Sequence, residues 1–172
     1  IATMDLRKPV ADGRRIVEVK NHAYRTATAK NFTRLRLPDT LVSIGQYAFQ
    51  GQALTALEPA LPDSLMTLEQ CSFQGMAYTG DIRLMNENYR QVNFEILSPT
   101  PIHSIYLGLG FDLFGGYGLR NWKCSASDNT IYLHGYQVPK TGSNWRDGWA
   151  TTAVRVCVPI YSDEWKEYLA AS

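Results

Sequence analysis

Short alternations of apolar and polar residues recur through the first half of the chain. Residues 35–37 read Leu-Arg-Leu, and a period of two predicts a short strand with its leucines inward and its arginine outward. Pro38 ends that strand because proline has no N–H to donate to a ladder, and Gly51 supplies the turn that follows. The side chains expected to point back into the interior between these two residues are Leu41, Ile44, Ala48 and Phe49.

The same pattern occurs twice in succession. Residues 38–55 (PDTLVSIGQYAFQGQALT) and residues 62–79 (PDSLMTLEQCSFQGMAYT) lie 24 residues apart and are identical at nine of eighteen positions. A fainter copy lies upstream, in residues 19–24. Repeats of about 20–29 residues are typical of leucine-rich solenoids, in which one coil cannot bury its own apolar edge. We therefore expect coils of about 24 residues that stack on one another and need a cap at each end.

A known family carries this motif. The pattern Leu-x-Leu-Pro-Asp-(Ser/Thr)-Leu-x-x-Ile-x-x-x-Ala-Phe-x-Gly spans Leu35 to Gly51 and recurs, less perfectly, from Leu57 to Gly75. It closely resembles the BspA-like leucine-rich repeat of bacterial surface proteins, over about residues 19–84. The resemblance implies an α/β leucine-rich-repeat solenoid that is β-rich with short helices. It would be short and right-handed, with a β-rich aromatic C-terminal cap. The second copy departs from the pattern by a two-residue insertion around Pro59.

The period is lost from the amino-acid sequence in the C-terminal half. Residues 162–171 predict a short helix with Ser162 as its N-cap, and the spacing places Trp165 and Tyr168 on the face that docks. The runs expected to form strands are Ile102–Leu107, Thr130–Leu133 and Val154–Val158. The expected divisions are an N-terminal cap (1–18), leucine-rich repeats (19–91), and degenerate coils with a C-terminal cap that ends in the short helix (92–172).

Composition narrows the class further. The 172 residues are 45% hydrophobic and 19% charged, which is enough for one folded domain and too little charge for a disordered chain. A net charge of +1 argues against nucleic-acid binding through the overall field. Residues 1–36 nevertheless carry nine basic and three acidic side chains, so this end is either a solvated surface or a docking face for an acidic partner or an anionic glycan. The longest uncharged run, residues 96–111, contains two prolines, so we expect no membrane span. We also expect a monomer.

No catalytic or metal-binding constellation is recognisable. Cys71, Cys124 and Cys157 are far apart, and none of the three histidines has metal-ligand spacing. We expect the thiols to be small core residues, with one disulfide as the alternative. Asp39 and Asp63 occupy the same position of the repeat, which favours a turn role over catalysis. We therefore expect no metal, no cofactor and no enzymatic activity.

Three functions compete. The resemblance implies a recognition or adhesion module at the outer surface of a bacterium or in its secretions, which binds a host matrix protein or a bacterial surface protein. The outward positions expected to carry that binding are Arg34, Arg36, Glu58 and Arg83. The second reading is a carbohydrate-binding accessory domain that uses the aromatic C-terminal segment. Its candidate residues are Trp122, Trp145, Arg146 and Trp149. The third is a structural spacer within a larger surface protein.

Overall fold

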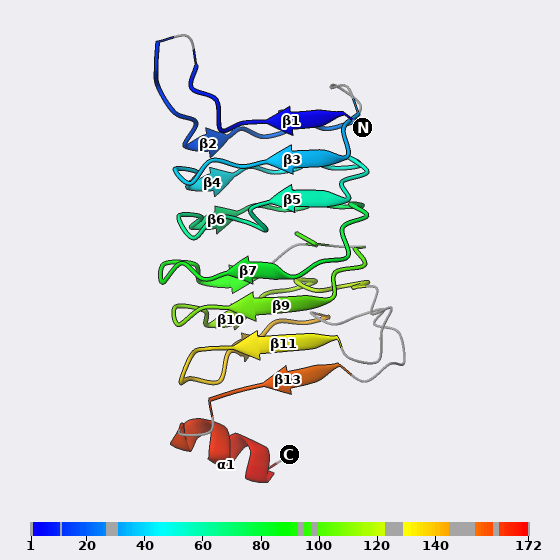
Figure 1. Ribbon diagram of the computed structural model, residues 1–172. Helices are drawn as coiled ribbons and strands as arrows, with labels where there is room; N and C mark the ends of the chain where they lie inside the picture. Colours follow the sequence, from blue (N-terminus) through cyan, green and yellow to red (C-terminus); the bar gives the residue numbers. More distant parts are fainter. Residues whose placement is uncertain are drawn as a thin grey trace.

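The computed structural model describes residues 2–10, 12–26, 31–92, 95–97, 100–122, 129–144, 154–159 and 162–171. Over these residues the chain forms a β-rich solenoid of about five turns with almost no helix. All paired strands are parallel, and each pairs with strands from the neighbouring turns. Figure 1 shows the turns stacked along one axis, with the two termini at opposite ends.

The strands form two faces. The longer strands make the long-strand face: β1 Thr3–Asp5, β3 Arg34–Arg36, β5 Ala56–Glu58, β7 Ile82–Leu84, β9 Ser104–Leu107, β11 Thr130–Leu133 and β13 Arg155–Cys157. The two-residue strands make the short-strand face: β2 Glu18–Val19, β4 Ser43–Ile44, β6 Thr67–Leu68, β8 Gln91–Val92, β10 Leu113–Phe114 and β12 Lys140–Thr141. We call the turns that lead from each long strand to the next short strand the turn edge. They are residues 6–17, 37–42, 59–66, 85–90, 108–112 and 134–139.

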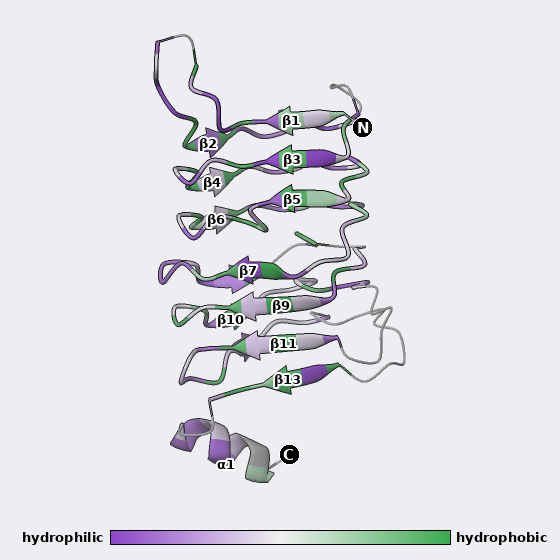
Figure 2. Ribbon diagram, viewed as in Figure 1, coloured by the Kyte–Doolittle hydropathy of each residue, from purple (hydrophilic) through white to green (hydrophobic). Residues whose placement is uncertain are grey.

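The predicted alternation is present in the strands. In β3, Leu35 is fully buried while Arg34 and Arg36 on either side are partly exposed. Figure 2 shows the same change from hydrophilic to hydrophobic within the strand. The four side chains expected to face the interior of that coil, Leu41, Ile44, Ala48 and Phe49, have no exposed surface. The alternation of apolar and polar residues therefore decides which side chains of each coil are buried.

Both faces are interrupted at the same level. The long-strand face divides into β1-β3-β5 and β7-β9-β11-β13, and the short-strand face into β2-β4-β6 and β8-β10-β12. The break follows the two-residue insertion: β5 pairs with β3 at an offset of 22 residues, whereas β6 pairs with β4 at an offset of 24. The Arg83 amide still donates to the Ala60 carbonyl across the break, over 3.4 Å. Figure 1 shows the wider separation between β5 and β7.

The turn after each short strand has one repeated conformation. The third residue beyond the strand has a positive φ of 54–59° in every described case, although none of these residues is glycine. The residues in this position are His22, Tyr47, Cys71, Glu95, Tyr117 and Asn144. Left-handed backbone is uncommon for side chains with a Cβ, so its recurrence marks one coil after another. The coils thus continue through the C-terminal half, where the amino-acid sequence has lost the repeat.

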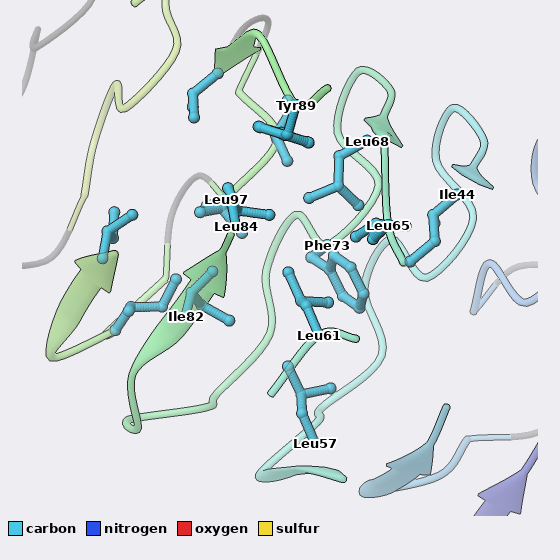
Figure 3. Packing of buried hydrophobic residues seen from close by; sticks show 14 of the residues in the cluster. Ile44, Leu57, Leu61, Leu65, Leu68, Phe73, Ile82, Leu84, Tyr89 and Leu97 are labelled. Carbon is cyan, nitrogen blue, oxygen red and sulfur yellow. The ribbon is translucent and has the colours of Figure 1, made fainter. Parts of the chain in front are cut away.

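The interior is a single apolar cluster that crosses the break. The Phe49 ring stacks between those of Tyr24 and Phe73, with centroids 5.5 and 5.2 Å away. Figure 3 shows Leu61 and Leu65, from the same coil as Phe73, gathered around its ring. Stacking of equivalent residues in successive coils therefore supplies the burial that one coil cannot.

The helix predicted at the C-terminal end is present as α1, Asp163–Ala171. The Ser162 hydroxyl accepts a hydrogen bond from the Trp165 amide at 3.4 Å, as an N-cap does. Trp165 is buried, and its Nε1 donates to the Gly135 carbonyl at 3.2 Å, which docks α1 on the last coil. Tyr168 was expected on the docked face and is instead 54% exposed. The helix therefore docks through a narrower face than its spacing predicts.

Candidate binding face of the solenoid

Charged side chains cluster on the outer surface of the first three long strands. Their alternation with buried leucines turns them outward, and the parallel register places Arg36 directly between Asp5 and Glu58. Arg36 Nε donates to Glu58 Oε2 at 2.8 Å, and its Nη1 lies 3.7 Å from Asp5 Oδ2. Arg34 also pairs with Glu58, and Arg7 Nη2 donates to Asp5 Oδ2 at 2.8 Å. The five side chains form one connected ion-pair network across three strands.

The network holds its carboxylates in the charged form. The hydrogen bond from Arg7 is the main cause that lowers the pKa of Asp5, while partial burial opposes it. The hydrogen bond from Arg36 likewise lowers the pKa of Glu58, helped by the nearby charge of Arg34. Charge-assisted hydrogen bonds of this kind fix side-chain geometry more than they add stability at an exposed surface.

Beyond the break, the same face carries a stack of aromatic rings. Tyr106 and Tyr132 are cross-strand partners on β9 and β11, and their rings are parallel to within 7° at a centroid distance of 4.4 Å. The Arg83 guanidinium on β7 lies 4.7 Å from the centre of the Tyr106 ring. Partial burial raises the pKa of Tyr106, and the nearby Asp81 carboxylate adds to the effect. Arg83 also lines a groove of about 470 Å³ at the break, beside Pro59.

We define the binding face by these eight residues: Asp5, Arg7, Arg34, Arg36, Glu58, Arg83, Tyr106 and Tyr132. Four of them, Arg34, Arg36, Glu58 and Arg83, were singled out from the sequence. The first three are brought into contact, while Arg83 lies on the same face beyond the break. The other four were missed. A signal for the tyrosines existed, because Ile-Tyr-Leu occurs at residues 105–107 and again at 131–133.

The tryptophan-based site needs a correction. Trp122 was expected at a binding surface, but its side chain is 1% exposed and its Nε1 donates to the Ile102 carbonyl at 2.8 Å. The ring fills the core between coils and has no surface to offer a ligand. The other members of that candidate site, Trp145, Arg146 and Trp149, lie outside the described residues.

The cysteines also depart in part from expectation. Cys71 is a buried thiol, and burial is the main cause that raises its pKa. Cys157 was expected in the core, but it is an exposed free thiol on β13, in register with Tyr132. Cys124 lies outside the described residues.

One cluster at the start of β7 and β9 resembles a catalytic constellation in composition. Asp81 Oδ1 lies 3.0 Å from His103 Nδ1, and the Ser104 hydroxyl lies 3.1 Å from the same nitrogen. A serine triad needs the acid on one ring nitrogen and the nucleophile on the other, so this geometry does not relay a proton from serine to aspartate through the ring. Within the described ranges, no three His, Cys, Asp or Glu side chains lie close enough together to hold a metal ion.

The geometry defines a short parallel β-solenoid with a fixed charged and aromatic outer face. Comparisons with protein-family models, with curated proteins and with solved structures find no match to this chain. In the part of the chain that the structure describes, no helix is long and apolar enough to cross a membrane.

Proposed function

We propose that the chain is a non-enzymatic recognition module that binds another protein through the binding face. Within this proposal it is a BspA-like leucine-rich-repeat domain that acts in adhesion at the outer surface of a bacterium or in its secretions. Its partner is a host matrix protein or a protein of a bacterial surface. The motif from Leu35 to Gly51 and its second copy support the family, and the stacked coils agree with it.

The observation that carries the proposal is that the side chains of the binding face hold one another in place. Arginine and tyrosine are the residue types most favoured at protein-binding hot spots. Here the arginines are held by carboxylates and by the Tyr106 ring, so they lose little conformational freedom when a partner binds. The face also extends over several coils along the axis of the stack, as do the solenoid surfaces that bind large partners.

The carbohydrate-binding alternative now has less support. It relied on a set of exposed aromatic rings in the C-terminal half, and Trp122 is in the core. The two tyrosines of the binding face cover each other's ring faces, which leaves less flat surface for a sugar to stack on. A protein partner therefore fits the exposed chemistry better than a glycan does.

The test is binding of the purified chain to a panel of matrix proteins, bacterial surface proteins and glycans, measured by biolayer interferometry. Tyr106→Ser removes the centre of the stack, and we expect about tenfold weaker binding to the protein partner. Tyr168→Ser is the matched control, because it removes an exposed tyrosine from α1. The control should bind as the unaltered chain does.

Circular dichroism must show that each variant is folded before binding is compared. The proposal is contradicted if Tyr106→Ser and Arg83→Glu both leave protein binding unchanged. Glycan binding that survives both changes would favour the carbohydrate-binding alternative, with its site in the aromatic C-terminal segment. A folded chain that binds nothing on the panel would favour the spacer.

A further inference from the structure

From the turn after β3 onward, the turn edge carries one carboxylate in each of four successive coils. These residues are Asp39, Asp63, Glu87 and Asp112. The first is already occupied by the chain itself, since Arg15 Nη1 lies 3.3 Å from Asp39 Oδ1. Asp63 and Glu87 have no ion-pair or side-chain hydrogen-bond partner within the described ranges. Two negative charges on adjacent coils are thus left without a cation.

Those two carboxylates line an open groove that is apolar on its other side. The groove has a volume of about 660 Å³, and Leu109 and Tyr136 from the next two coils complete its wall. Leu109 is 64% exposed and Tyr136 is 65% exposed, the largest exposed fractions among the large apolar side chains of the described residues. Both also line a smaller groove of about 280 Å³ beside Arg90, so the apolar surface continues past the first groove.

We propose that this groove binds a basic segment of a partner protein, one that carries a lysine or arginine next to an apolar residue. The cationic head group lies at the carboxylates of Asp63 and Glu87, and its aliphatic stem lies along Leu109 and Tyr136. Long basic side chains combine an apolar stem with a charged tip, and this is the combination that the groove presents. The Tyr136 ring adds a face for the cation.

The charges in and around the groove favour a cation over other ligands. An anionic group would be repelled by Asp63 and Glu87. The one arginine of the neighbouring groove, Arg90, is engaged: its Nη1 donates to the Gly110 carbonyl at 3.0 Å. His134 also lines the groove.

The chain supplies its own example of such a contact. Arg15, from the turn after β1, reaches the first carboxylate of the row, Asp39, at the same turn position that Asp63 occupies one coil later. A partner arginine at Asp63 would repeat this contact. The groove adjoins the binding face, because Asp63 also lines the 470 Å³ groove beside Arg83. None of its lining residues belongs to that face, so this proposal does not depend on the proposed function.

The test uses fluorescence anisotropy with two labelled decapeptides. The probe contains two Leu-Arg pairs spaced by Gly and Ser, and its control has Glu in place of each Arg. We expect the basic probe to bind at low salt and more tightly than the acidic control. Its affinity should fall as the sodium chloride concentration rises, because the Debye length shortens. Asp63→Asn with Glu87→Gln should weaken binding roughly tenfold, from two lost surface ion pairs. Tyr136→Ser should weaken it as well.

A charge-matched control excludes a general field effect. Asp12→Asn with Glu18→Gln removes two exposed carboxylates from the first coil, outside the groove, and should leave the affinity unchanged. Equal loss in both double variants would overturn the proposal, as would equal binding of the acidic peptide. A neutral oligosaccharide that displaces the probe, and whose own binding needs Tyr136 alone, would reassign the groove to a sugar. Sedimentation that detects self-association abolished by the Asp63 and Glu87 changes would reassign it to a second copy of the chain.

Discussion

A hydroxyl group inside the apolar core distinguishes Tyr89 from its equivalents in other coils. Its amide makes the same turn hydrogen bond as those of Leu41, Leu65 and Phe111, with the carbonyl three residues earlier. Those three side chains are wholly apolar, whereas the Tyr89 hydroxyl is buried without a hydrogen-bond partner in the described part of the chain. Burial raises the pKa of this phenol, which therefore stays neutral. An unpaired buried polar group is a cost that the fold carries.

Removal of that hydroxyl should stabilise the protein. We expect Tyr89→Phe to raise the free energy of unfolding by about 1 kcal/mol, because phenylalanine keeps the ring and loses the unpaired oxygen. Urea denaturation followed by circular dichroism measures the change. Tyr168→Phe, at an exposed position, should differ from the unaltered chain by less than about 0.5 kcal/mol. A less stable Tyr89→Phe variant would mean that the hydroxyl has a partner, such as a buried water.

At the scale of the element, glycine closes the turn between coils. Gly51 has a φ of +77°, and a Cβ added there would lie 2.5 Å from the Thr26 hydroxyl oxygen of the previous coil. Gly13, in the turn after β1, has a similar φ of +80° but no atom within 4 Å of an added Cβ. Alanine at Gly13 therefore tests backbone strain alone, whereas alanine at Gly51 tests backbone strain together with close packing.

We expect Gly51→Ala to cost more stability than Gly13→Ala. Both substitutions force alanine into left-handed backbone, at roughly 1–2 kcal/mol, and the Gly51 variant must also displace Thr26. Midpoints of urea unfolding for the two variants give the comparison directly. Equal losses at the two sites would show that the coils separate easily enough to admit a methyl group.

Elements of the first half were accessible from the sequence, because each coil there repeats both side-chain type and spacing. The C-terminal coils keep the backbone and change the side chains. Leu119 follows the short strand at the interval of Phe49, and Asn121, with a φ of 55°, at that of Gly51. Leucine and asparagine can take these places because the interior needs an apolar group and the turn needs left-handed backbone. A search by residue identity therefore misses these coils.

The tryptophan prediction failed for a related reason. Trp122 and Gln52 occupy the same place after the turn, both are buried, and each donates a side-chain N–H to a backbone carbonyl. Met76 occupies the same place in the third coil and is also buried, so the position requires a buried side chain, and composition alone gives no sign of that. The outward arginines were easier to predict, because alternation within a strand fixes their direction without any knowledge of neighbouring coils.

At the scale of the whole molecule, one core joins two sets of ladders. The apolar cluster runs the length of the described solenoid, whereas backbone pairing stops between β5 and β7 and between β6 and β8. The Arg83 amide, which crosses the break, makes a 3.4 Å contact, and the Gly108 amide in the next coil donates to Leu84 at 2.9 Å. Side-chain packing therefore joins the two sets of ladders at this level, together with a few hydrogen bonds outside the strands. The Phe73 amide donates to the Ile96 carbonyl at 3.2 Å, and Asn86 Nδ2 donates to the Asp63 carbonyl at 2.8 Å.

We expect the break to be the level at which the solenoid opens most readily. The Arg83 amide should exchange with solvent deuterium roughly ten times faster than the Gly108 amide, because its longer hydrogen bond breaks with a smaller opening. Native-state hydrogen exchange measured by NMR resolves the two amides. Equal protection would show that the two sets of ladders open as one unit.

The position of the termini has a mechanical consequence. Because the ends lie at opposite ends of the stack, a pull on them acts along the hydrogen bonds that join one coil to the next (Figure 1). Such bonds then yield coil by coil instead of sharing the load. Where the coil offset is 24 residues, each released coil lengthens the chain by roughly 80 Å. Under tension the molecule therefore lengthens in steps, one coil at a time, while its remaining coils stay folded.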